Sequence, residues 1–408
     1  MNIQLINSVN NFYGNIKICG SKSESNRLLI LKAMFPKIKL NNISNSDDTK
    51  TIITALKSNE KKIDIHHAGT AMRFLTAYFA FQSKKEVFLT GSKRMKERPI
   101  KILVEALREM GALISYHEND GFPPLLIRSS RPSKNYIKLS SSLSSQYVSA
   151  LMLIAPKIPN GLFIEMSGRM TSMSYIKMTQ SILENIGVNV KFNKKKISIT
   201  NKLNIDSKTV KVESDWSSAS YFFSIVALSK DSNIRLSSFK KTSLQGDSNL
   251  INIYKELGVS SKFEDDTLIL KKQTNFTFPN HIKLDLIDSP DIAQTIAVTC
   301  FGLGISCDLF GLHTLKIKET DRLYALKKEL IKLGADAYST ENSFHLKSSK
   351  NINQNIMIST YEDHRMAMAF APLSIKTPLE IENPDVVNKS YPNFWNDLYS
   401  IGFQCVKK

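Results

Sequence analysis

One hydrophobic pattern recurs along the chain: an amphipathic helix, a glycine, and then a short strand of alternating apolar and polar residues. In the first copy, Ile100, Val104 and Leu107 share one helical face before the glycine interrupts the helical spacing. The pattern with a glycine occurs at 107–116, 183–192, 254–263, 330–339 and 398–406. We therefore predict five helix–strand pairs of one kind.

The glycines of this pattern stand where each helix is expected to end. Glycine adopts the left-handed conformation without a steric cost, and many helices end on such a residue. We predict that conformation at Gly111, Gly187, Gly258, Gly334 and Gly402. A sixth and weaker copy of the pattern, at 53–65, lacks the glycine.

A second pattern comes before each copy of the first. Small or polar residues, which suit helix N-caps, open a helix that is almost wholly apolar. The copies lie at 21–33, 67–80, 144–155, 217–228, 289–300 and 362–373. An apolar helix without a polar face is typical of a helix buried on nearly every side.

Together the two patterns predict six units of about βαβαββ, and three units per domain would give two domains of ordinary size. The fold class is therefore expected to be α/β. Helix N-termini carry partial positive charge and free N–H donors. If the six helix openings converge, they would form a binding site for anions.

Composition narrows the class of protein. The chain has 408 residues, 42% of them hydrophobic and 23% charged, with a formal net charge of +18. That charge suits nucleic acid, an anionic membrane or highly anionic small substrates, although a lysine-rich surface without a specific partner would also explain it. We see neither a signal peptide nor an apolar stretch long enough to span a bilayer, and expect a cytoplasmic protein.

The four cysteines do not indicate a metal site. Cys19, Cys300, Cys307 and Cys405 form no CxxC pair, and no histidine stands at metal-ligand spacing to them. Buried, reduced thiols are the favoured interpretation.

Six clusters of polar and charged residues coincide with the helix openings or closely precede a helix. They are GSKSESNR (20–27), AGTAMR (68–73), RMKERP (94–99), SSQ (144–146), Asp291 with KETDR (318–322), and DHRMAM (363–368). Arginines and lysines at helix starts suit phosphate or carboxylate groups. The two carboxylates Asp291 and Glu319 are candidates for acid–base chemistry among cations. Taken singly, each cluster could instead be helix capping, a solvated turn or a salt-bridge lattice.

Taken in this order, the six clusters resemble the signatures of the enolpyruvyl transferase family, and specifically of its EPSP synthase branch. The SSASYF (217–222) and LQGD (244–247) stretches also match, and the resemblance runs from about residue 14 to about 395. It implies two similar domains, each of three βαβαββ units (an inside-out α/β barrel), with an interdomain cleft. The implied domains are 21–212, and 1–20 with 213–408.

The resemblance also implies a reaction. The enolpyruvyl group of phosphoenolpyruvate would pass to the 5-hydroxyl of shikimate 3-phosphate, with release of phosphate, in the step before chorismate synthesis for aromatic amino acids. No metal or organic cofactor is implied. We expect a monomer that acts on these small anions and binds neither nucleic acid nor membrane.

Site residues are carried over by their motifs. Asp291 would accept the hydroxyl proton, Glu319 would protonate the methylene carbon, and Lys22 would assist both substrates. The expected shikimate 3-phosphate ligands are Lys22, Ser23, Arg27, Ser144, Ser145, Gln146, Ser172, Tyr175, Asp291, Thr314 and Lys318. The expected phosphoenolpyruvate ligands are Lys22, Gly69, Arg98, Gln146, Arg322, Arg365 and Lys389.

Four positions depart from the family pattern. His67 and Thr314 stand where asparagine is usual, and Glu362 stands where asparagine is common. Phe74 follows the arginine of AGTAMR where proline is frequent. His67 and Phe74 lie where a change could alter the response to glyphosate, the inhibitor of this family.

Three alternatives remain. One is a non-catalytic member of the same family, which is disfavoured because the catalytic candidates are all present. UDP-N-acetylglucosamine enolpyruvyl transferases resemble this family in architecture, but they typically carry a cysteine in the loop that corresponds to 90–99, where this chain has none. An RNA-binding or cyclase-like protein is the alternative that the net charge suggests. Such a protein should bind RNA or DNA with a steep salt dependence, whereas weak binding that salt abolishes would indicate only a basic surface.

Overall fold

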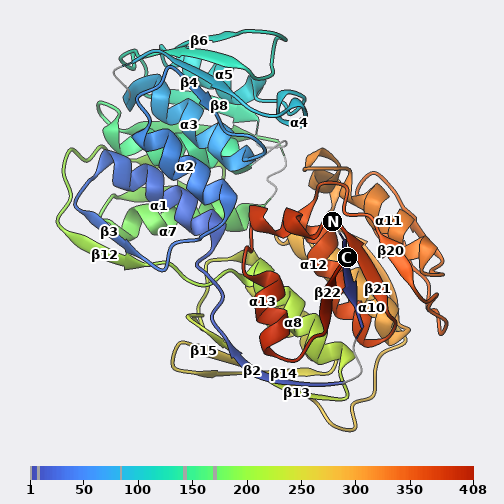
Figure 1. Ribbon diagram of the computed structural model, residues 1–408. Coiled ribbons are helices and arrows are strands. Elements are labelled where there is room, and N and C mark those ends of the chain that lie inside the picture. The colour runs from blue at the N-terminus through green and yellow to red at the C-terminus, as the bar shows by residue number, and fades with distance from the viewer. Residues whose placement is uncertain (1, 7–9, 83–84, 141–144, 169–171) are drawn as a thin grey trace. The chain divides into compact units, whose positions relative to one another are not determined.

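The computed structural model describes residues 2–6, 10–82, 85–140, 145–168 and 172–408. It is an α/β protein, as the sequence predicted, and it divides into two compact units (Figure 1). The middle unit comprises Gly20–Val212, and the terminal unit comprises Met1–Cys19 with Glu213–Lys408. Within the described ranges, no helix is long and apolar enough to cross a membrane.

The described part of the terminal unit contains three four-stranded sheets. The first sheet has the strand order β20 (Ile356–Ile358), β21 (Leu379–Glu382), β1 (Asn2–Leu5) and β22 (Cys405–Lys407). The second has the order β14 (Val259–Glu264), β15 (Thr267–Lys272), β13 (Asp231–Ser237) and β2 (Asn11–Ile16). The third has the order β16 (His281–Asp285), β17 (Ser306–Phe310), β19 (Phe344–Leu346) and β18 (Ala337–Ser339). The two N-terminal strands thus pair with strands from the second half of the chain.

The middle unit contains two four-stranded sheets and, among its described residues, one two-stranded sheet. Their strands are β4 (Lys62–Asp64), β5 (Val87–Thr90), β7 (Leu125–Arg128) and β6 (Leu113–Tyr116); β10 (Val190–Asn193), β11 (Lys196–Ile199), β9 (Leu162–Ser167) and β8 (Tyr136–Ser140); and β12 (Lys208–Lys211) with β3 (Ile38–Asn41).

All five four-stranded sheets share one topology. Two neighbouring strands run parallel, as β4 and β5 do, and an antiparallel pair follows, as β7 and β6 do. This is the strand arrangement expected of a βαβαββ unit, because parallel strands need a crossover connection and antiparallel strands can form a hairpin. The predicted repeat is therefore confirmed in five copies.

The sixth copy differs from the expectation. The strand anticipated at the end of 53–65 is β4, and it pairs with β5 of the next sheet rather than with β3. The weaker copy has no glycine stop, and the chain passes from α2 (Asp47–Lys57) directly into the next sheet. The sheet of β3 and β12 therefore receives no hairpin from this segment.

Each unit has three apolar helices at its centre. They are α1 (Lys22–Met34), α3 (Gly69–Gln82) and α6 (Ser145–Ile154) in the middle unit, and α8 (Trp216–Leu228), α10 (Ala293–Leu303) and α12 (His364–Phe370) in the terminal unit. The three middle-unit helices contact one another, and α10 contacts both α8 and α12. The predicted burial is confirmed, since nearly every residue of α8 and α12 is buried.

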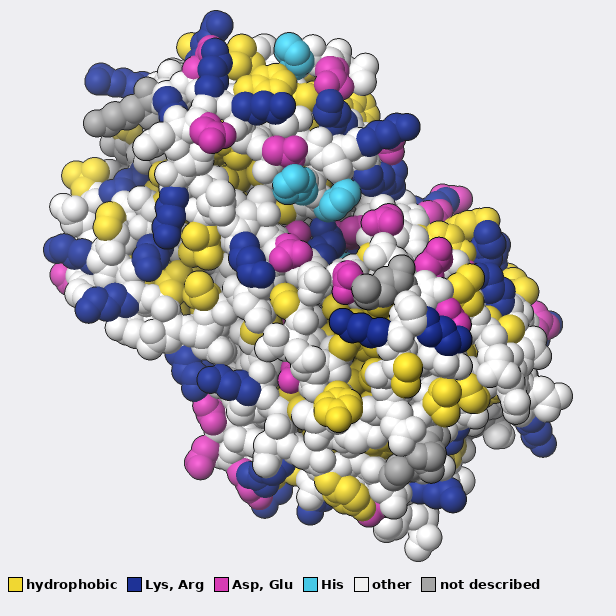
Figure 2. All heavy atoms as spheres, in the orientation of Figure 1, with side chains coloured by type: hydrophobic (Ala, Val, Ile, Leu, Met, Phe, Trp, Pro, Cys, Tyr) yellow, Lys and Arg dark blue, Asp and Glu magenta, His cyan; other side chains and the backbone are white. Residues whose placement is uncertain are grey.

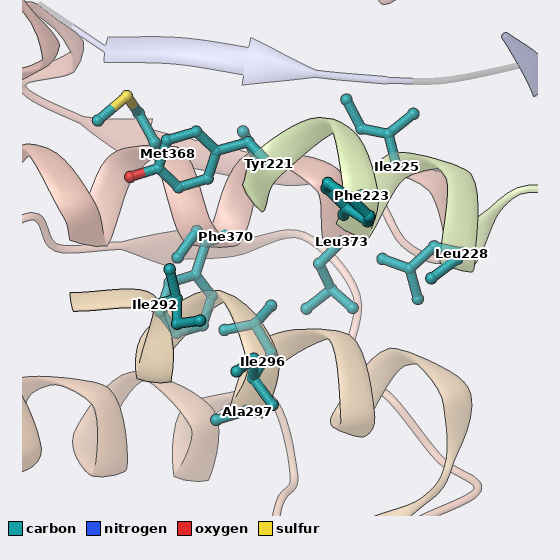
Figure 3. Close-up of a cluster of buried hydrophobic side chains, with 14 of the residues drawn as sticks. Tyr221, Phe223, Ile225, Leu228, Ile292, Ile296, Ala297, Met368, Phe370 and Leu373 are labelled. Carbon is teal, nitrogen blue, oxygen red and sulfur yellow. The ribbon is translucent and has the colours of Figure 1, made fainter. Parts of the chain in front are cut away.

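Figure 3 shows this central packing in the terminal unit. Tyr221 and Phe223 come from α8, Ile296 comes from α10, and Phe370 and Leu373 come from α12 and the turn after it. All of these side chains belong to one buried cluster, so the three helices pack together in the core of the unit.

Amphipathic helices lie outside these bundles and end at the predicted glycines. They are α5 (Lys101–Glu109), α7 (Met173–Asn185), α9 (Leu250–Lys255), α11 (Arg322–Lys332) and α13 (Phe394–Ser400). The glycine φ values are 101° at Gly111, 82° at Gly187, 77° at Gly258, 95° at Gly334 and 104° at Gly402. The predicted left-handed conformation is confirmed at all five positions.

Short helices complete the description. They are α4 (Lys93–Lys96) and the 3₁₀ turns η1 (Ala155–Lys157), η2 (Gly246–Asn249), η3 (Pro290–Ile292), η4 (His313–Ile317), η5 (Ala371–Ile375) and η6 (Pro384–Lys389). Several of them carry the polar residues that the sequence singled out.

Candidate functional site

In the terminal unit, the candidate residues gather around Arg322, the first residue of α11. Its side chain is only 2% exposed. Its Nε donates to Asp363 Oδ2 at 2.6 Å, its Nη1 donates to Asp291 Oδ1 at 2.9 Å, and its Nη2 donates to Glu319 Oε2 at 2.9 Å. One guanidinium therefore joins three carboxylates from three separate segments of the chain, as its planar array of N–H donors permits.

Three more cations surround the same carboxylates. Lys318 Nζ lies 3.4 Å from Asp291 Oδ1, and Arg365 Nη2 lies 3.3 Å from Asp291 Oδ2. Lys389 Nζ, at the end of η6, lies 3.6 Å from Glu319 Oε1. The four cations and three carboxylates, hereafter the terminal-unit cluster, have a formal charge of plus one.

The cations set the protonation state of Asp291. Burial alone would raise the pKa of this carboxyl, but Arg365, Lys318 and Arg322 together hold the pKa well below its usual value. Asp291 is therefore ionised at neutral pH. Burial likewise acts to lower the pKa of Arg322, but Asp363, Glu319 and Asp291 raise it above its usual value, so its charge is fixed.

Asp247 lies next to this cluster, linked to it through Ser217. The Ser217 hydroxyl donates to Asp247 Oδ2 and accepts a hydrogen bond of 3.4 Å from Arg365 Nη2. Burial, and then the negative charge of Asp291, raise the pKa of Asp247 to about 7. This carboxyl can therefore exchange a proton close to neutral pH.

Thr314 lies on η4, and its hydroxyl oxygen is buried without a hydrogen-bond partner among the described residues. A buried hydroxyl that makes no hydrogen bond is costly, so a bound ligand would be a natural partner for it.

In the middle unit, Arg27 is the buried centre of a second group. Its Nε donates to Thr179 Oγ1 at 2.8 Å, and its Nη2 donates to Ser149 Oγ at 3.1 Å. The guanidinium also lies 5.3 Å from the ring centre of Phe74 and 5.6 Å from that of Tyr175. Burial lowers the pKa of Arg27 to about 10, which leaves it charged at neutral pH.

Other predicted residues of the middle unit lie at the same helix openings. Lys22 Nζ lies 3.1 Å from Asp48 Oδ2 at the start of α2, and Gln146 Nε2 donates to Thr70 Oγ1 at 3.4 Å. The carbonyl oxygen of Ser23 accepts a hydrogen bond of 2.8 Å from Arg27 Nη1.

Gly69, the first residue of α3, is a point of close approach. A Cβ added there would lie 2.6 Å from Arg98 Nη1, so only glycine lets that guanidinium reach the helix start. Ser145 and Ser172 are buried at the starts of α6 and α7, and Ser172 is left-handed with φ of 54°. Ser144 lies outside the described residues.

Several residues that contact the predicted ones were not themselves predicted as ligands. Asp363 and Asp247 stood in quoted motifs, but no spacing showed that they would face Arg322 and Arg365. Ser149 and Thr179, which hold Arg27, are 30 residues apart on two helices. In the sequence, each of the two is marked only as a polar residue within a helix pattern, and nothing there shows that its partner is Arg27.

The departures from the family pattern also have defined surroundings. His67 is exposed, and its Nδ1 lies 2.9 Å from Ser92 Oγ. Phe74 is fully buried against Arg27, so it supports that guanidinium rather than facing solvent. Glu362 is exposed with φ of 57°, and it accepts from Asn383 Nδ2 at 3.3 Å.

Among the described residues no group of three or more His, Cys, Asp or Glu could hold a metal ion.

Comparisons with known proteins identify the family. The sequence model of EPSP synthase (3-phosphoshikimate 1-carboxyvinyltransferase) matches residues 56–398. Among curated proteins, the 3-phosphoshikimate 1-carboxyvinyltransferase of Bacteroides fragilis strain YCH46 is 42% identical over 403 residues, covering 98% of each chain. That of Haemophilus influenzae strain PittGG is 34% identical, covering 97% of each chain.

A solved structure supports the same fold. EPSP synthase from Acinetobacter baumannii superposes with a TM-score of 0.79 over 100% of both chains at 20% sequence identity. Because the family model and the curated relatives match most of the sequence, and the solved structure matches the fold, the chain belongs to the EPSP synthase (3-phosphoshikimate 1-carboxyvinyltransferase) family.

Proposed function

We propose that this protein transfers the enolpyruvyl group of phosphoenolpyruvate to the 5-hydroxyl of shikimate 3-phosphate and releases phosphate. The reaction would belong to the shikimate pathway, before chorismate and the aromatic amino acids. Family membership supports this reaction. The observation that carries it is the terminal-unit cluster, in which four cations surround two candidate acid–base carboxylates, Asp291 and Glu319.

The cluster suits an anionic ligand because its cations are held near one another by carboxylates. Arg322 is fixed by Asp363, while Arg365 and Lys389 make longer ion pairs of 3.3 and 3.6 Å with the candidate acid–base groups. We propose that Arg322, Arg365 and Lys389 bind phosphoenolpyruvate and that Lys318 and Thr314 contact the shikimate moiety. Charge-assisted hydrogen bonds of this kind are worth about 1.5–3 kcal/mol each.

We propose that Asp291 takes the proton of the attacking hydroxyl. Its low pKa keeps it ionised, but an ion-paired carboxylate is a weak base. When the phosphoenolpyruvate anion engages Arg365, it competes for the cation that stabilises Asp291, and the pKa of Asp291 should rise toward that of a useful base.

Glu319 would supply the second proton transfer. As the hydroxyl oxygen bonds to C2 of phosphoenolpyruvate, the methylene C3 must gain a proton, and Glu319, once protonated, would donate it. In the second step Glu319 would take back a proton from the new methyl group as the C2–O bond to phosphate breaks, which restores the double bond. The proton taken by Asp291 would leave with the released phosphate. Two acid–base groups on separate elements can serve these opposite transfers.

The middle-unit residues would complete the binding of the same two substrates. We propose that Arg27, Ser23, Ser144, Ser145, Ser172 and Tyr175 contact shikimate 3-phosphate, that Gly69 and Arg98 contact phosphoenolpyruvate, and that Lys22 and Gln146 contact both. Arg27 already uses Nε and Nη2 to hold its helix partners, so its orientation is set before the ligand arrives.

Phosphorus NMR of the reaction mixture tests this proposal. With both substrates present, the phosphoenolpyruvate signal should decrease while inorganic phosphate and a new phosphate monoester increase in equal amounts. Arg322→Met should abolish the conversion, whereas Arg235→Met, which removes a surface ion pair with Glu264, should not change it. If Arg322→Met still converts the substrates, the terminal-unit cluster does not take part in the reaction as proposed.

A further inference from the structure

Glu329 is a fully buried carboxylate that the proposed reaction does not use. It lies on α11, and its side chain is 0% exposed. Its Oε1 accepts from the Tyr361 hydroxyl at 2.6 Å, and its Oε2 accepts from Ser359 N at 3.1 Å. Lys332 Nζ completes the set at 2.7 Å from Oε2. Two of the three donors therefore belong to the short segment that precedes α12.

That segment has an uncommon backbone. Tyr361 has φ of 54° and Glu362 has φ of 57°, so two consecutive residues with side chains are left-handed. Neither is a residue that adopts this conformation readily, so neighbouring contacts must hold the segment in place. The Glu329 carboxylate supplies such contacts, because it binds the segment at Ser359 and again at Tyr361.

The segment leads directly into the terminal-unit cluster. Asp363 follows it, accepts from the backbone N of Arg365 at 2.9 Å and binds Arg322. Arg322 and Glu329 are seven residues apart on α11, which is two helical turns, so both face the same neighbour. Helix α11 therefore holds residues 359–365 at two points, through Glu329 at the start and through Arg322 at Asp363.

We propose that Glu329 is a positioning residue for the phosphoenolpyruvate site. It fixes the turn at 359–362, and the turn sets the direction in which Arg365 leaves the start of α12. This inference rests on the proposed function, because Arg365 is proposed there as a phosphoenolpyruvate ligand. Glu329 itself would touch neither substrate.

Glu329→Gln is the direct test. The amide keeps the shape of the side chain but offers one acceptor oxygen where Ser359, Tyr361 and Lys332 now use two. We expect the KM for phosphoenolpyruvate to rise by about tenfold or more, while kcat and the KM for shikimate 3-phosphate stay within about threefold. Tyr361→Phe removes one of the three donors and should raise the same KM by a smaller factor.

A matched control separates positioning from general instability. Ile253→Ala shortens a buried side chain on α9, in the same unit but on another helix. It should lower the melting temperature at least as much as Glu329→Gln. If the two variants raise the KM for phosphoenolpyruvate equally, Glu329 only stabilises the fold and the proposal is wrong.

Hydrogen exchange gives a second readout that does not depend on activity. In Glu329→Gln, amides of residues 359–365 should exchange faster than in the unaltered protein, while amides of α10 should not. Unchanged exchange in that segment would overturn the proposal even if the enzyme is active. If the unaltered protein shows no activity, the proposed reaction is wrong, and exchange still decides whether Glu329 holds the segment.

Discussion

At the scale of single residues, charge and burial define the candidate chemistry. Asp291 and Asp247 are both acidic groups near Arg365, but their surroundings have opposite effects. Cations on both oxygens of Asp291 lower its pKa, whereas burial raises that of Asp247 to about 7. The first carboxyl is therefore an ionised acceptor, and the second can carry a proton at neutral pH.

Replacing Asp291 by asparagine should abolish proton acceptance without changing the shape of the side chain. We expect kcat to fall by about 100-fold or more, because general-base catalysis contributes factors of that size. Asp336→Asn, which removes a surface ion pair with Lys347, is the control and should leave kcat unchanged. Steady-state kinetics measure both, and Asp291→Asn with more than about a tenth of the normal kcat would rule out the assigned role.

The raised pKa of Asp247 leads to a prediction about how the stability of the protein depends on pH. Its folded-state pKa of about 7 lies above the ordinary value of 3.8, so its protonated form favours folding at low pH and that contribution is lost as the pH rises toward 7. Asp247→Asn cannot ionise and should escape this loss. The stability difference, variant minus unaltered, should therefore increase between pH 5 and pH 8 by at most about 3 kcal/mol, because the loss runs over about two pH units, from pH 5 to pH 7.

Urea unfolding at both pH values measures that difference. Asp336→Asn provides the reference for an exposed aspartate in an ion pair. A stability difference for Asp247→Asn that is the same at pH 5 and pH 8 would show that this carboxyl does not titrate in the interval.

At the scale of elements, the repeated helix–glycine–strand unit determines where the site residues lie. The glycine stops allow each outer helix to turn into the strand that follows it. Candidate cations lie at the starts of inner and outer helices alike, as Lys22 does in α1, Arg322 in α11 and Arg365 in α12. Gly402 is the clearest stop, because it has φ of 104° and a Cβ added there would meet nothing within 4 Å. Any cost of a side chain at this position comes from the backbone alone.

Gly402→Ala should destabilise the terminal unit by about 1 kcal/mol or more, because alanine must adopt a left-handed conformation. Asn396→Ala, at an exposed position of the preceding helix α13, should be close to neutral. Chemical unfolding of the two variants measures the difference. If Gly402→Ala is as stable as the unaltered protein, glycine is not required at this helix end.

The elements also show what the sequence could predict. Helix faces, glycine stops and buried inner helices follow from local periodicity, and they were correct in the five copies that carry the glycine. The pairing of β1 with β21 and the docking of Asp363 on Arg322 join residues that are far apart in the chain, at separations of hundreds of residues and of 41. Local patterns contain no information about such partners, so these contacts required the structure.

At the scale of the whole molecule, the net charge of +18 calls for a physical explanation. On the face drawn in Figure 2, lysine and arginine side chains lie in small groups interspersed with acidic ones, without a continuous basic stripe. Many surface lysines make ion pairs, such as Lys61 with Glu86 and Lys96 with Glu118. On this face, the distribution favours a solvated basic surface over a nucleic-acid interface.

We therefore expect only weak, nonspecific binding to RNA. Fluorescence anisotropy with a labelled RNA single strand should show association at about 20 mM salt that disappears at about 200 mM. The reason is that such binding consists only of contacts between surface cations and RNA phosphates, which salt screens. Binding that persists at the higher salt with a preference for one sequence would favour a nucleic-acid function.

The most direct test of the account is phosphate release from phosphoenolpyruvate with different acceptors. The purified protein is assayed with shikimate 3-phosphate, with UDP-N-acetylglucosamine, and with no acceptor. We predict release only with shikimate 3-phosphate, in an amount equal to the limiting substrate. Release with the nucleotide sugar instead, or none with shikimate 3-phosphate from protein whose circular dichroism shows it to be folded, would contradict the proposed function.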